Sequence, residues 1–204
     1  GTAFVNNGGS AIISFPGPIS KTSAGLLLNI TNRTANAVTL NGALTCNSGC
    51  TGISVSNNSG GTIIMAGAAT LATGVSTALS LTNNAGTTIA LSGSLTITTS
   101  SGNGISASGG GTITITGAVN TVASGTGTAV NINGVTIGAA GVTFRSVAAN
   151  GGTNGIVLNN TGAGPFTISG NAAANTGGTI QSTTGPGMLF TSTGPITLNW
   201  IRLA

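Results

Sequence analysis

The stretch SVSNNSGGTIIMAG, residues 54–67, combines an alternating strand pattern, a pair of Asn, a pair of Gly and a closing glycine. The same pattern returns as SLTNNAGTTIALSG (80–93), as NITNRTANAVTLNG (29–42) and, shortened, as SASGGGTITITG (106–117). Successive closing glycines are separated by 25, 25, 26 and 24 residues, counted over Gly17, Gly42, Gly67, Gly93 and Gly117. A repeat of this length indicates a solenoid, in which each unit buries its apolar face against its neighbours.

Aliphatic side chains alternate with small or polar ones inside each unit, which places them on one face of a β-strand. The predicted core columns are Ile13 and Phe15, Val38 and Leu40, Ile63 and Met65, Ile89 and Leu91, and Ile113 and Ile115. A second strand precedes the Asn pair in eight units, from Ala3 and Val5 to Met188 and Phe190. A weaker third column follows the closing glycine, at Ile19, Leu44, Leu71, Leu95 and Val119.

Three short strands per unit predict an all-β fold, a three-faced parallel β-helix of about eight turns of roughly 25 residues each. In this fold each strand pairs with its equivalents in the turns above and below, at about 4.8 Å spacing. We expect the coil to be right-handed, because parallel crossovers have that hand in about 98% of cases.

The repeat covers the whole sequence, so we expect residues 1–204 to form a single β-solenoid domain. The unit from Ile156 to Met188 is 32 residues long, and its extra length predicts an outward loop insertion near 170–178. Strand patterns reach both ends, in GTAFVNN and ITLNWIRLA, where a free solenoid would need polar capping turns. We therefore expect a segment of a longer chain or a filament subunit, with its own copies or adjoining β-helix turns stacked end to end as partners.

Charged side chains are nearly absent: the sequence has no Asp, Glu or His, and four cations, at Lys21, Arg33, Arg145 and Arg202. Scattered cations and a single Trp offer no platform for phosphates or stacked bases, so we expect no nucleic-acid binding. No stretch approaches the roughly 18 unbroken apolar residues of a membrane helix, and we expect no membrane insertion. Apolar residues make up 39% and the mean hydropathy is +0.45, which favours a packed structure over disorder.

The sequence lacks the side chains that acid–base and hydrolytic catalysis commonly use, since it has neither carboxylate nor imidazole side chains. We predict no enzymatic activity and no cofactor. Cys46 and Cys50, in CNSGC, lack the further ligands of a metal site, so we expect no metal. A local structural disulfide between them is our preferred interpretation for an oxidising compartment, with two reduced thiols as the alternative.

Polar columns provide the remaining candidates. We predict a structural Asn ladder, because stacked amides donate and accept along the axis and Asn tolerates left-handed backbone; its members are Asn7, Asn32, Asn57, Asn83 and Asn160. Sugar contacts from this amide row are the alternative. Thr-rich strands raise ice binding as a minor alternative, although the outward column considered is mixed: Ser14, Thr39, Ile64, Ala90 and Thr114.

Four stretches of the repeat carry a resemblance to a known family: NITNRTANAVTLNGAL (29–44), GISVSNNSGGTI (52–63), GTAVNINGVTIGAAGVTFRSVAANGGTNGIVLNNTG (127–162) and GGTIQSTTG (177–185). These phrases resemble the large bacterial β-strand-repeat surface proteins, right-handed β-helices related to adhesin passenger domains. The resemblance implies an extracellular or cell-surface location and a non-catalytic role as the scaffold of an adhesin or self-assembling filament. The alternative is a glycan-binding or polysaccharide-processing β-helix, with surface glycans as partners.

Overall fold

The computed structural model describes residues 1–47 and 49–204, which form three parallel sheets of eight strands each. Sheet A contains β1 (Phe4–Gly9), β4 (Leu28–Arg33), β7 (Ile53–Ser56), β10 (Leu79–Thr82), β13 (Ile105–Ser108), β16 (Val130–Asn133), β19 (Ile156–Asn159) and β22 (Met188–Thr191). Sheet B contains β2 (Ile13–Phe15), β5 (Ala37–Leu40), β8 (Thr62–Met65), β11 (Thr88–Leu91), β14 (Thr112–Ile115), β17 (Thr136–Phe144), β20 (Phe166–Ile168) and β23 (Ile196–Leu198). Sheet C contains β3 (Ile19–Lys21), β6 (Leu44–Cys46), β9 (Ala69–Gly74), β12 (Leu95–Thr99), β15 (Thr121–Ser124), β18 (Ser146–Asn150), β21 (Thr179–Gln181) and β24 (Arg202–Leu203).

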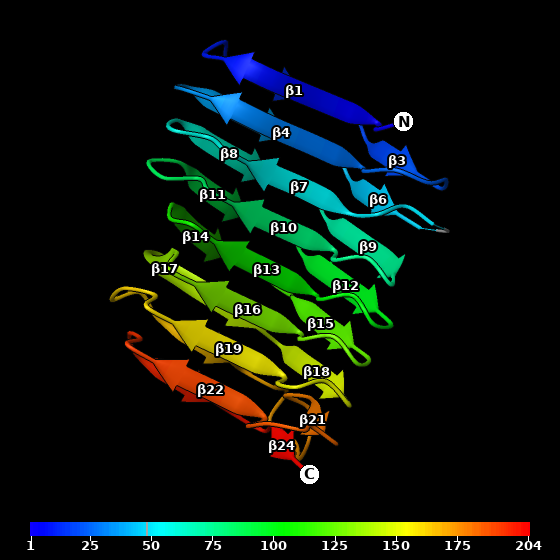
Figure 1. The fold of residues 1–204 in the computed structure, drawn as a ribbon, viewed down its shortest axis with the longest axis vertical. Coiled ribbons are helices and arrows are strands. Elements are labelled where there is room, and N and C mark those ends of the chain that lie inside the picture. Colours follow the sequence, from blue (N-terminus) through cyan, green and yellow to red (C-terminus); the bar gives the residue numbers. More distant parts are fainter. Residues whose placement is uncertain (48) are drawn as a thin grey trace.

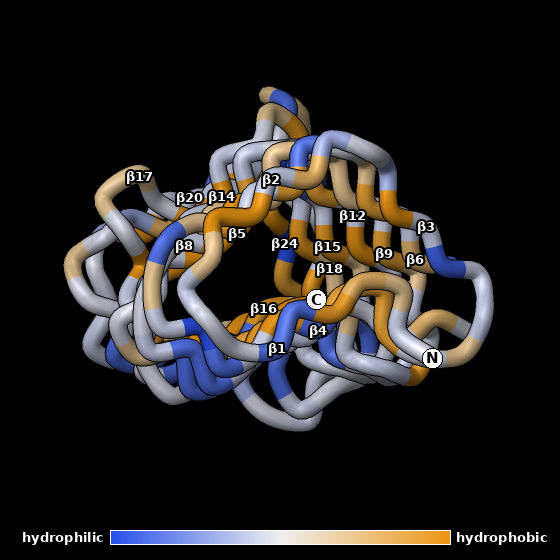
Figure 2. Tube along the Cα trace, turned by 90° about the horizontal axis from the view of Figure 1, so that it is seen from above, coloured by the Kyte–Doolittle hydropathy of each residue, from blue (hydrophilic) through white to orange (hydrophobic). Residues whose placement is uncertain are grey.

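The chain visits the three sheets in turn and makes about eight turns, which confirms the predicted β-solenoid (Figure 1). Figure 2 views the stack from its N-terminal end, where the chain passes clockwise from β1 to β2 to β3. Successive turns recede from that end, so the coil is right-handed. Among the described residues, no helix is long and apolar enough to cross a membrane.

The apolar columns meet inside the coil and form one continuous core. In β5, β8, β11 and β14 the predicted pairs are all buried: Val38 and Leu40, Ile63 and Met65, Ile89 and Leu91, and Ile113 and Ile115. Ile13 and Phe15 occupy the same columns in β2, paired with Val38 and Leu40. Ile13 is only partly buried and Phe15 is 37% exposed, because no turn of the described chain covers β2 from above.

Two of the predicted inward columns contain residues that the strand pairing places elsewhere. In β1, Phe4 and Asn6 stand opposite Leu28 and Ile30, so the predicted inward pair Ala3 and Val5 is displaced and Val5 is 58% exposed. The Phe4 ring packs against the Phe15 ring, with centroids 6.0 Å apart, and this contact favours Phe4 as the inward residue. On sheet C, Leu71 aligns with Ile97 rather than Leu95, and Val119 is exposed before β15 begins.

The closing glycines lie between sheets B and C, where consecutive turns come into close contact. A Cβ atom added to Gly67 would lie 2.0 Å from the carbonyl oxygen of Gly42, and one added to Gly93 would lie 2.1 Å from that of Gly67. No side chain fits at such a distance, so the corner requires glycine in every turn from Gly42 to Gly117. The regular glycine interval is therefore a consequence of the stacking.

Two outward excursions interrupt the later turns. Residues 170–178 connect β20 to β21, and most of these residues are exposed, in the region where the repeat length predicts an insertion. A second excursion lies inside β17, where Ile137 pairs with Ile113 and the next paired residue is Val142, opposite Ile115. The residues between them extend outward, and the β17 segment stands away from the coil in Figure 2.

Candidate functional site

The exposed Asn residues lie at the corner between sheets A and B. Asn32, Asn57, Asn83 and Asn160 all have left-handed backbone, with φ between 51° and 58°. The described contacts join two pairs: Asn32 Nδ2 donates to Asn7 Oδ1 at 2.9 Å, and Asn83 Nδ2 donates to Asn57 Oδ1 at 3.3 Å. Below Asn83 the equivalent corner positions are glycines, Gly109 and Gly134, which separate Asn160 from the others. The predicted ladder is thus two pairs and a separate Asn160.

In the dipeptides Asn57–Asn58 and Asn83–Asn84 the second Asn is buried, and neither Asn58 nor Asn84 is a member of the predicted ladder. Asn58 and Asn84 are each 1% exposed. Asn58 Nδ2 donates to Asn84 Oδ1 at 2.7 Å, and Asn84 Nδ2 donates to the Val55 carbonyl at 2.9 Å. The repeated NN dipeptide could have indicated this burial, because the left-handed backbone of Asn57 and Asn83 turns the next residue toward the interior.

Buried amide oxygens also accept backbone N–H groups from the preceding turn. Asn58 Oδ1 accepts from the N–H of Arg33 at 2.8 Å, and Asn84 Oδ1 from that of Asn58 at 3.4 Å. At another corner, Asn120 Oδ1 accepts from the N–H of Leu95 at 2.9 Å. A buried backbone N–H without an acceptor is costly, and corners are where strand pairing stops supplying one. These Asn side chains therefore join consecutive turns.

Arg33 is a buried cation, only 2% exposed. Its Nη2 donates to the carbonyl oxygens of Ala11 at 2.6 Å and Ala35 at 2.9 Å. Nη1 is buried and has no hydrogen-bond partner among the described residues. Since the sequence contains no acidic side chain, backbone carbonyls are what hold this charge.

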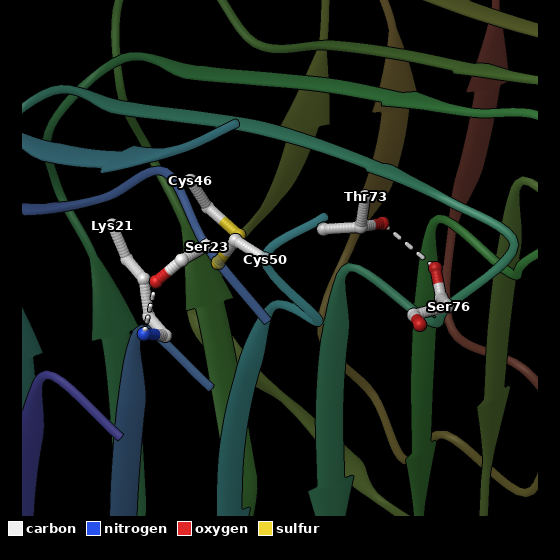
Figure 3. Close-up of a disulfide and its surroundings, with 6 residues drawn as sticks. All are labelled: Lys21, Ser23, Cys46, Cys50, Thr73 and Ser76. Atoms are coloured by element: carbon white, nitrogen blue, oxygen red, sulfur yellow. Dashed lines mark hydrogen bonds between the residues drawn. A yellow bond between two sulfur atoms is a disulfide. The ribbon is translucent and has the colours of Figure 1, made fainter. Parts of the chain in front are cut away.

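The corner between sheets C and A is closed differently in successive turns (Figure 3). Cys46 and Cys50, both fully buried, form a disulfide with their Cα atoms 5.4 Å apart. One turn later, Thr73 Oγ1 donates to the Ser76 carbonyl at 2.7 Å. The next turns use the same hydroxyl contact, from Thr99 to the Gly102 carbonyl at 2.6 Å and from Ser124 to the Gly127 carbonyl at 2.8 Å. The disulfide thus closes the same corner that later turns close with a buried hydroxyl, although Cys46 itself pairs with Leu71.

A hollow of about 510 Å³ opens on sheet B beside the β17 excursion. Its lining contains no aromatic or ionisable side chain and consists of Thr112, Thr136, Ile137, Gly138, Ala139, Ala163, Gly164 and Pro165. The described residues also contain no cluster of His, Cys, Asp and Glu that could hold a metal ion. The chemistry of this hollow is limited to two hydroxyls, backbone groups and methyl contacts.

Both end turns leave apolar side chains in contact with solvent. In the first turn, Val5, Ile12 and Phe15 are 58%, 75% and 37% exposed. In the last turn, Leu189 and Trp200 are 43% and 48% exposed. The inward columns of these turns are only partly buried, at Phe4, Ile13, Met188, Phe190, Ile196, Leu198 and Ile201. A further turn would cover these inward columns, whereas Val5 and Leu189 lie at outward positions of their strands.

The chain matches no protein family, no curated protein and no solved structure.

Proposed function

We propose that this protein is a non-catalytic structural module, the β-solenoid scaffold of an extracellular surface adhesin or of a self-assembling filament. The observation that carries the proposal is the stacking of eight like turns in register around one continuous apolar core. Each turn resembles the next, so β1, β2 and β3 offer the strand edges and apolar columns that β22, β23 and β24 would meet in a stacked neighbour.

The recurring residues support a structural role because each of them is used within the stack. The closing glycines allow turns to approach, the buried Asn side chains satisfy backbone groups of the preceding turn, and the buried hydroxyls close corners. The Cys46–Cys50 disulfide fits an oxidising, extracellular environment.

Light scattering and negative-stain electron microscopy of the 204-residue chain, over a range of concentrations, test the self-stacking version. We expect rods of constant width that lengthen with concentration. The variant Phe4→Lys with Met188→Lys places charge in both end columns and should leave monomers, because burying an unpaired charge in a stacked interface is costly. Val75→Lys, at a site 77% exposed between the ends, is the matched control and should stack normally. A monomer at every concentration in the unaltered chain contradicts self-stacking.

The hollow beside β17 favours one second candidate, a glycan-binding β-helix. Its open shape and the hydroxyls of Thr112 and Thr136 suit weak contacts with a sugar chain. A glycan array distinguishes this function: binding that Thr136→Lys abolishes would support it, whereas an array without signal would reject it.

A further inference from the structure

The outer face of sheet C carries an unbroken row of hydroxyl groups. Strand pairing places six residues in register on six consecutive turns: Ser20, Thr45, Thr70, Thr96, Thr121 and Ser146. At about 4.8 Å per strand spacing, the row is about 24 Å long. Thr70 and Thr96, near its middle, are exposed.

A second row of methyl-bearing side chains runs beside the first, two residues further along each strand. Its members pair in register across four turns: Ala72, Thr98, Ala123 and Ala148. The step from Thr96 to Thr98 is about 6.6 Å along the strand. Neither row contains a charged, amide or aromatic side chain, so the two rows form a regular lattice of hydroxyls and methyls.

The hydroxyls of the first row are available to water. Among residues 1–47 and 49–204, the hydroxyls of Thr45, Thr70, Thr96 and Thr121 make no hydrogen bond to another protein group. By contrast, polar side chains at the edge of sheet A bond to each other, as Asn32 does to Asn7 and Asn159 to Asn133. Water molecules on sheet C would therefore be held by groups whose spacing the strand ladder fixes.

Strand propensity alone does not account for this face. Thr is common on outward strand positions because β-branched side chains suit a pleated surface. Yet sheet A, at the same heights, carries Ser and Asn in its outward row: Asn29, Ser54, Ser80, Ser106 and Asn131. On sheet B one outward column is interrupted by Ile64 and Ala90, and the hydroxyl row beside it spans four turns and is half-buried in the first three: Thr62, Thr88, Thr112 and Thr136. The hydroxyl row of sheet C is longer than either of these, with six turns in register and exposed members at its middle.

We propose that the outer face of sheet C binds ice, through the hydroxyl row Ser20 to Ser146 and the methyl row beside it. The two repeat distances of this face, about 4.8 Å across the strands and about 6.6 Å along them, are fixed by the strand ladder, so water bound to the hydroxyls would be ordered in two dimensions. Hydroxyls can hold water at those positions, while methyl groups favour ordered water because they offer it no competing hydrogen bond. A polysaccharide chain fits less well, because ligand sites of that kind are concave and the hollow described above lies on sheet B rather than on this face.

Ice recrystallisation inhibition and thermal hysteresis of the full chain test the proposal. The unaltered chain should inhibit recrystallisation and shape growing ice crystals. Thr96→Tyr places a bulky ring in the middle of the hydroxyl row and should lose most of this activity. Ser80→Tyr, on sheet A in the same turn, is the matched control and should keep it. Thr70→Tyr provides an independent variant, and circular dichroism with a thermal unfolding curve verifies that each variant is folded.

Three results would overturn the proposal. The first is a folded chain without any effect on ice. The second is equal loss, or no loss, in the sheet C and sheet A variants, which would remove sheet C as the binding face. The third is retention on crystalline cellulose or chitin without an effect on ice, which would assign the face to a polysaccharide. None of these results bears on end-to-end stacking, which is measured separately.

Discussion

Truncation of Asn84 to Ala should destabilise the protein by about 2–4 kcal/mol, because it removes a buried amide that serves two turns. Asn84 Oδ1 accepts from Asn58 Nδ2 at 2.7 Å and from the Asn58 N–H at 3.4 Å, while Asn84 Nδ2 donates to the Val55 carbonyl at 2.9 Å. Three buried hydrogen bonds at about 1 kcal/mol each account for most of this estimate. The unsatisfied Asn58 N–H, in a site 1% exposed, adds the remainder.

Equilibrium unfolding in guanidinium chloride, followed by circular dichroism, measures this difference in unfolding free energy. The neighbouring variant Asn83→Gly is the control: Asn83 is exposed, and glycine adopts its left-handed backbone without strain. Its change should stay within about 0.5 kcal/mol. An Asn84→Ala change as small as that of the control would refute the role assigned to the buried amides.

Four further outcomes follow from individual contacts. Gly67→Ala should destabilise by about 3 kcal/mol in the same assay, because its Cβ would overlap the Gly42 carbonyl; an unchanged midpoint would contradict the close approach of turns. Arg33→Met should stabilise by about 1–4 kcal/mol by removing a buried charge that lacks a carboxylate partner; a clear loss of stability would show that its two carbonyl contacts dominate. Replacing Cys46 and Cys50 together by Ala should lower the unfolding free energy by about 2 kcal/mol, since the disulfide closes only a short loop; a much larger loss would require another explanation. The thermal midpoint should be nearly constant between about pH 5 and pH 7, where no side chain of this composition titrates, and a marked slope there would disagree.

The repeat period was sufficient to predict the fold. Glycines at intervals near 25 residues and alternating aliphatics predict three strands per turn, and the structure has them, stacked like on like. The prediction succeeds because each unit repeats the same local choices of strand, turn and closing glycine. In Val38, Leu40, Ile63 and Met65 the alternation leaves a single choice of inward face.

The predicted inward face is wrong where the sequence pattern allows either of two neighbouring residues to point inward. In AFVNN either Phe4 or Val5 can point inward, and only the contact between Phe4 and Phe15, distant in sequence, distinguishes them. Val119 was misplaced for another reason: an extra residue before β15 puts the buried Asn120 opposite Leu95 and Val122 opposite Ile97.

The candidate sites depended on three-dimensional information that the sequence lacks. The sequence suggested an Asn column but not the burial of Asn58 and Asn84, since that depends on the left-handed turn at the residue before each. The hydroxyl row of sheet C also escaped notice. Its members belong to differing phrases, such as LTC (44–46) and TVAS (121–124), and strand pairing is what aligns them.

The central claim, that turns stack in register along one axis, is tested most directly by pulsed electron paramagnetic resonance between spin labels at Ser20 and Ser146. These outward residues are joined by five consecutive strand pairings, which place their backbones about 24 Å apart. A second pair, at Ser20 and Thr96, spans three pairings and should give about 14 Å. We predict two narrow distance distributions whose difference is two strand spacings. Broad distributions, or equal distances for the two pairs, would contradict the stacked solenoid.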